Sequence, residues 1–246
     1  MKRLLLFISA FLLMYGGLQA QPISGTKAVG PTGDYPTITA AIAAITTNTL
    51  SGPTILELQP AYTSGGETFP LSLSGLPTSV SNTLTIRPAA TAAALAISSG
   101  ATATLSLDGT RYVTIDGRPG GMGTTKALII DNTLPTGNAI VFENDASNNT
   151  ILFCTITGVT TSPTSGVVLF GSTTGTMGND DNLISDCDIL DGASTPTISI
   201  YCSGSATTGL ENSGNTIANC NIGNFFSPTD ASCGVNLATG ANGWTL

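Results

Sequence analysis

Hydrophobic and polar positions alternate in short runs along most of the chain. These runs are rich in Ile, Leu, Val and Thr, and Gly, Pro, Asn or Asp residues bound them. This alternation is typical of short β-strands separated by turns. Before residue 137 the runs cover residues 54–58, 68–73, 83–88, 104–109, 112–117 and 127–132.

One early segment has a different period. Over residues 37–47, Ile38, Ile42 and Ile45 recur at helical spacing with alanines between them. Thr37 follows Pro36 and is a suitable N-cap. We therefore predict one short α-helix ahead of the strands.

From residue 137 onward, two kinds of strand alternate. The phrases "NNTILFCTIT", "DNLISDCDIL" and "GNTIANCNIG" recur, and their cysteines, Cys154, Cys187 and Cys220, are each 33 residues apart. A fixed period of this size indicates a solenoid, propeller or array. Too few strands fall in each repeat for a propeller blade, which favours a parallel β-helix whose coils stack about 4.8 Å apart.

Equivalent residues of stacked coils should form ladders. The phrases align Asn149, Asn182 and Asn215 at a turn, where an asparagine caps exposed backbone groups or adopts a left-handed conformation. They also align isoleucines and the three cysteines as core positions, with a corner expected between Ile184 and Cys187.

The second kind of strand comprises "NAIVF", "GVVLF", "TISIY" and "GVNLA". Its expected inward pairs are Ala139/Val141, Val167/Leu169, Ile198/Ile200 and Val235/Leu237. This alignment places Phe142, Phe170 and Tyr201 outside as an aromatic ladder able to stack on sugar rings. The alternative is that the long loops after these strands cover the ladder.

Charge is distributed unevenly. Residues 127–246 contain ten acidic residues and no Lys, Arg or His, so their net charge is −10. Nucleic acid is therefore an unsuitable partner, because binding it requires clustered bases. Asp180, Asp181, Asp186 and Asp188 form a candidate calcium site, since calcium prefers carboxylate oxygens; the alternative is a solvated acidic face.

Residues 1–20 have the pattern of an export signal. Lys2 and Arg3 precede a short apolar run, and Ala20 is a small residue before a cleavage point. We expect residues 21–246 to form one exported domain without a membrane span. The chain stops inside what reads as a new coil, so we expect truncation at that end, with further coils or self-association there.

The five cysteines are compatible with export but do not form a metal motif. There is no CxxC pair and no histidine, which argues against zinc. We expect reduced, buried thiols for the three ladder cysteines. Cys202 and Cys233 either stay free or pair across neighbouring coils.

The segment "KAVGPTGDYPTITAAIAAI" resembles the opening of pectin methylesterases, through Gly33, Asp34, Tyr35, Thr37 and the residues that follow. The coil phrases resemble those of the pectate-lyase-like superfamily. The resemblance implies a right-handed parallel β-helix with a helix capping its first coil. The mature chain also resembles uncharacterised secreted bacterial β-helix surface proteins.

The catalytic phrases of those enzyme families are absent from the sequence. Asp180 and Asp181 are adjacent carboxylates of the kind that glycoside hydrolysis uses, but no motif surrounds them. We expect a non-catalytic, adhesin- or stalk-like protein, secreted or on the cell surface, with an extracellular polysaccharide as partner. The alternative is a lyase, esterase or hydrolase of polysaccharides whose catalytic coils lie partly beyond residue 246. Phe225 and Phe226, in "GNFFSP", either bind sugar or pin their loop.

Overall fold

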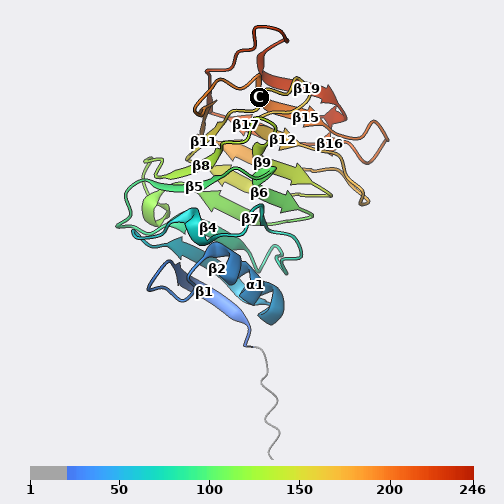
Figure 1. Cartoon of the computed structure of the whole chain (residues 1–246). Coiled ribbons are helices and arrows are strands. Elements are labelled where there is room, and N and C mark those ends of the chain that lie inside the picture. Colours follow the sequence, from blue (N-terminus) through green and yellow to red (C-terminus); the bar gives the residue numbers. More distant parts are fainter. Residues whose placement is uncertain (1–20) are drawn as a thin grey trace, which may run out of the picture.

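The computed structural model describes residues 21–246, which form a parallel β-helix of about seven turns (Figure 1). The export signal predicted for residues 1–20 lies outside the described residues. Within residues 21–246, no helix has the length and apolar character that crossing a membrane requires. The all-β solenoid expected from the repeats is confirmed.

Three parallel sheets run along the solenoid, and each coil contributes about one strand to each sheet. The first sheet contains β1 (Ile23–Val29), β2 (Leu50–Leu58), β4 (Leu84–Pro88), β7 (Val113–Asp116), β10 (Thr150–Leu152), β13 (Leu183–Ser185) and β17 (Thr216–Ala218). The second sheet contains β5 (Leu95–Ser99), β8 (Leu128–Asn132), β11 (Cys154–Gly158), β14 (Asp188–Asp191) and β18 (Asn221–Ile222). The third sheet contains β3 (Leu71–Ser72), β6 (Ala103–Asp108), β9 (Asn138–Glu143), β12 (Val168–Phe170), β15 (Ile198–Ser203) and β19 (Cys233–Thr239).

The remaining elements are short. β16 (Asn212–Ser213) pairs with β20 (Ala241–Asn242), and two 3₁₀ turns cover Ser64–Gly66 and Pro119–Gly121.

The helix α1 (Ile38–Asn48) covers the N-terminal end of the solenoid, near β1 and β2 (Figure 1). Thr37 is its N-cap, and the Thr37 hydroxyl accepts a hydrogen bond from the Ala40 amide at 3.0 Å. Ile38, Ile42 and Ile45 are buried, as their helical spacing predicts. The helix expected over residues 37–47 is therefore confirmed, shifted by one residue.

Three of the later coils turn a sharp corner between the first and second sheets. Phe153, Asp186 and Asn219 adopt left-handed backbone conformations there, with φ of 50°, 54° and 53°. This corner lets both Ile184 and Cys187 point into the core, as the broken alternation of their spacing predicts.

The asparagine ladder is confirmed and lies inside the solenoid. The backbone N–H and Nδ2 of Asn149 donate to Asn182 Oδ1 at 3.1 and 3.0 Å, and Asn182 repeats both bonds to Asn215 Oδ1 at 2.9 and 3.0 Å. Each amide also donates to a carbonyl of the preceding turn, as Asn182 does to Ala146 O at 2.8 Å. The ladder thus pairs buried polar groups from coil to coil.

Trp244 occupies the next position of this ladder. It precedes Thr245, which pairs with Thr216, so it lies one coil beyond Asn215. Its indole Nε1 donates to Asn212 O at 2.7 Å, in place of an asparagine amide. Because an indole has no acceptor, Trp244 cannot accept from the Asn215 amide as an asparagine would.

All five cysteines are free thiols. Cys154 and Cys187 are buried, and the Cys154 amide donates to Cys187 Sγ at 3.4 Å. A side-chain hydrogen bond with Cys154, together with burial, raises the pKa of the Cys187 thiol. Cys202 lies opposite Leu237, and Cys233 lies opposite Ile198. The two cysteines are therefore not neighbours across the coils, and the disulfide considered between them is not formed.

Candidate functional site

The predicted external aromatic ladder is wrong. Phe142 and Phe170 are fully buried in the core, with their rings stacked at a centroid distance of 4.3 Å and an interplanar angle of 6°. In the third sheet, Val168 pairs with Ile140 and Ile200, and Phe170 pairs with Phe142. The inward residues of β9 and β12 are therefore shifted by one from the expected ones, and neither phenylalanine can reach a sugar.

Tyr201 belongs to the opposite face of the same sheet. It pairs with Leu169 and Asn236 rather than with the phenylalanines. Only 7% of Tyr201 is exposed, so it presents no platform for a sugar ring. The outer position of β15 at Tyr201 is therefore covered rather than open to a ligand.

The four aspartates of the candidate calcium site are engaged separately. Asp188 forms an ion pair with Lys126 at 2.7 Å, and Asp180 Oδ1 accepts from the Ser213 amide at 2.7 Å. Asp181 and Asp186 occupy left-handed turn positions, with φ of 55° and 54°. Among residues 21–246, no group of three or more acidic, cysteine or histidine side chains gathers in a metal-ligating arrangement.

Two aspartates on neighbouring coils have opposite pKa shifts. Burial raises the pKa of Asp180, and the neighbouring carboxylates of Asp181 and Asp145 add to this effect. Burial alone would raise the pKa of Asp145 too, but hydrogen bonds from the Thr173 hydroxyl and the backbone amides of Thr176 and Met177 hold it below its usual range. Asp145 thus anchors the loop after β12.

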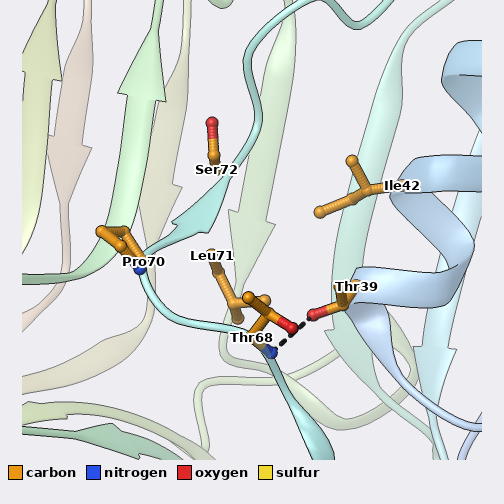
Figure 2. A pocket seen from close by; sticks show the side chains of 6 residues that line it. All are labelled: Thr39, Ile42, Thr68, Pro70, Leu71 and Ser72. Atoms are coloured by element: carbon orange, nitrogen blue, oxygen red, sulfur yellow. Dashed lines mark hydrogen bonds between the residues drawn. The ribbon is translucent and has the colours of Figure 1, made fainter. Parts of the chain in front are cut away.

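A small apolar hollow of about 180 Å³ lies between α1 and the segment leading into β3 (Figure 2). Ile42, Pro70 and Leu71 supply its apolar wall, and Thr39 and Thr68 lie at one edge. The Thr39 hydroxyl is already used, because it donates to Glu67 Oε2 and accepts from the Thr68 amide. The hollow therefore offers few polar groups to orient a ligand.

A larger and more polar groove, of about 430 Å³, lies between the second and third sheets. Its lining comes from the connections that join these sheets in three successive coils: β11–β12, β14–β15 and β18–β19. The lining residues are Thr161, Ser194, Thr195, Thr197, Phe226, Ser227, Pro228, Thr229 and Asp230. We call this feature the hydroxyl groove.

A short sequence motif recurs in the three connections. The tripeptides are Ser162-Pro163-Thr164, Thr195-Pro196-Thr197 and Ser227-Pro228-Thr229. Their prolines follow one another by 33 and 32 residues, which matches the coil period. The second and third tripeptides line the hydroxyl groove, whereas the first connection contributes Thr161, the residue before its tripeptide. The recurring spacing is still a signal that could have located the groove from sequence.

The two loop aromatics have different roles. Phe226 is 61% exposed and lines the hydroxyl groove. Phe225 is partly buried, and its ring lies against Gly234, where an added Cβ would come within 3.3 Å of it. The two alternatives therefore divide between the pair: Phe225 packs within the loop, whereas Phe226 is open to solvent beside the groove.

The hydroxyl groove combines the groups that recognise sugars. Hydroxyls both donate and accept hydrogen bonds, a carboxylate accepts them, and an aromatic ring covers apolar C–H surface. Asp230 is exposed and has two local partners, the hydroxyls of Ser227 and Thr229.

Comparison with known proteins identifies no relative. No protein-family model, no curated protein and no solved structure matches the chain.

Proposed function

We propose that this protein is a non-catalytic β-helix protein that is exported and works outside the cell or on its surface, where it contacts glycans. The observation that carries the proposal is the hydroxyl groove, in which exposed Phe226 lies among serine and threonine hydroxyls and one carboxylate. The solenoid supports the role by holding three loops in fixed succession, so that one ligand can touch several coils. This arrangement is the basis on which we propose an adhesin- or stalk-like role.

The sequence resemblance to the pectate-lyase-like superfamily is part of the proposal. It rests on the segment around Asp34 and Tyr35 and on the coil phrases, and it carries the expectation of right-handed winding. Export rests on the pattern of residues 1–20. Cell fractionation with an antibody to the chain tests it, and retention of the whole pool in the cytoplasm would overturn it.

A pull-down with insoluble polysaccharides tests the binding function. The full chain should be retained on at least one polysaccharide and should release neither new reducing ends nor unsaturated ends. Failure to bind any polysaccharide would overturn the proposal.

A polysaccharide-active enzyme is the second candidate. The observation in its favour is that Asp180 lies beside the Asp181 carboxylate and that burial raises its pKa, which is the direction that a general acid requires. The same assay tests this candidate. If the protein releases new polysaccharide ends and Asp180→Asn abolishes that release, the protein is an enzyme and the non-catalytic role is overturned.

A further inference from the structure

We propose that the hydroxyl groove binds an uncharged sugar unit in preference to a uronic acid. This inference rests on the proposed glycan-contacting function and names the ligand class of the same site. Phe226 supplies the stacking surface and Asp230 the strong acceptor. The surrounding hydroxyls belong to Thr161, Ser194, Thr195, Thr197, Ser227 and Thr229.

Phe226 is exposed yet held in place by the neighbouring coil. Its backbone N–H donates to Pro196 O at 2.8 Å, and its carbonyl accepts from the Thr195 hydroxyl at 3.2 Å. Both partners belong to the preceding connection, so the backbone that carries the ring is held in place before a ligand arrives. Such preorganisation lowers the entropic cost of binding.

Asp230 keeps one carboxylate oxygen for a ligand. The hydroxyls of Ser227 and Thr229 donate to its Oδ2 at 3.2 and 2.9 Å. Among the described residues, the hydrogen bonds to this carboxylate use Oδ2, which leaves Oδ1 to accept from a sugar hydroxyl. A hydrogen bond to an ionised acceptor is stronger than one between neutral groups.

The electrostatics of the groove select against acidic ligands. The groove lining contains a carboxylate and no base, and residues 127–246 contain no Lys, Arg or His. A uronate in the groove would therefore place its carboxylate near Asp230 without a counter-charge. Repulsion between such exposed charges weakens binding about fivefold at low salt and less at high salt.

The test compares matched polysaccharide pairs: galactan with polygalacturonate, glucan with polyglucuronate, and mannan with polymannuronate. Retention of the full chain is measured at low salt by affinity electrophoresis. We expect binding to at least one neutral polymer and binding at least about fivefold weaker to its uronate. Preference for a uronate would overturn the inference.

Variants assign the effect to the groove. Phe226→Ala should weaken retention on the neutral polymer about tenfold, by loss of the stacking surface. Asp230→Asn should weaken it severalfold and also reduce the discrimination against the uronate, because the repelling charge is gone. Met122→Ala is the matched control, since Met122 is 79% exposed on a different loop, and it should bind like the unaltered chain.

The outcomes separate the inference from the proposed function. If the protein binds a glycan and neither Phe226→Ala nor Asp230→Asn alters retention, the site assignment is overturned and the function stands. If the unaltered protein binds no glycan, the function itself is overturned, and the inference with it. Both altered residues are exposed, so circular dichroism should show unchanged folding.

Discussion

Residues 21–126 carry five acidic and five basic side chains, whereas residues 127–246 carry ten acids and no base. The early coils use this balance in partly exposed ion pairs. Arg87 reaches Glu57 on the coil before it at 2.9 Å, and Arg118 pairs at 2.9 Å with Asp116, two residues before it. The later coils instead connect through buried asparagines that carry no charge.

Coils of one solenoid are thus joined in two ways, by the Arg87–Glu57 ion pair and by the asparagine ladder. Exposed ion pairs add little stability, because water and salt screen them. Buried amides that satisfy each other are costly to disrupt, because a lost partner leaves buried polar groups unpaired. The later half, with a net charge of −10, therefore joins its coils through neutral amides in the interior.

The first prediction targets the asparagine ladder and has the largest expected effect. Asn182→Ala removes the acceptor of two Asn149 donors and the donor to Ala146 O. We expect the free energy of unfolding to fall by about 3 kcal/mol. Urea denaturation followed by circular dichroism measures the loss.

Asn221→Ala is the matched control for the ladder. Asn221 belongs to the same half of the chain, but its side chain is exposed on β18. We expect Asn221→Ala to change the free energy of unfolding by no more than about 0.5 kcal/mol. Equal losses for the two variants would contradict the view that the ladder stabilises the later coils.

The second prediction concerns the capping helix of the early coils. Glu67 lies at the N-terminus of α1, where its carboxylate accepts from the Ile38 and Thr39 amides at 2.7 and 2.8 Å and from the Tyr62 hydroxyl at 2.9 Å. Burial and the Glu67 carboxylate raise the pKa of Tyr62, so this hydroxyl stays protonated and donates. Glu67→Ala should lower the free energy of unfolding by about 2 kcal/mol.

Glu67→Gln distinguishes the charge from the geometry. The amide keeps one acceptor oxygen but loses the favourable interaction with the positive end of the helix dipole. Glu67→Gln should lower the free energy of unfolding by less than Glu67→Ala does. If neither substitution lowers the free energy of unfolding, the Glu67 contact does not stabilise α1.

The third prediction concerns the surface ion pairs and has the smallest effect. Both side chains of the Arg87–Glu57 pair are about a quarter exposed or less, at 21% and 26%. Arg87→Ala should lower the free energy of unfolding by less than about 1 kcal/mol, and the difference should be smaller in high salt. A loss as large as that of Asn182→Ala would remove the distinction between the two halves.

The ladder phrases were readable from sequence because their polarity differs sharply between neighbouring positions. Ile151, Ile184 and Ile217 pair in register, as their 33-residue spacing predicts. The strands "NAIVF" and "GVVLF" lack that contrast, since residues on both faces are apolar and buried. An error of one residue in the inward positions exchanges the two faces of a strand. The expectation that Phe142 and Phe170 lie outside contains this error.

The candidate site was only partly predictable for a related reason. Phe226 was noted as a loop aromatic, but its neighbours in the hydroxyl groove come from connections that are distant in sequence. Thr161 and Thr195 reach the same groove as Phe226 only because the coils stack.

The sequence by itself determined the coil period, the helix that begins after Thr37 and the ladders of Asn149 and Cys154, because each follows from local periodicity or from repetition of a distinctive phrase. Only the tertiary structure decided which apolar side chains point inward, that Asp188 pairs with Lys126, and that three loops form one groove. Those outcomes depend on how neighbouring coils cover each face and on which distant side chains the stacking brings within reach.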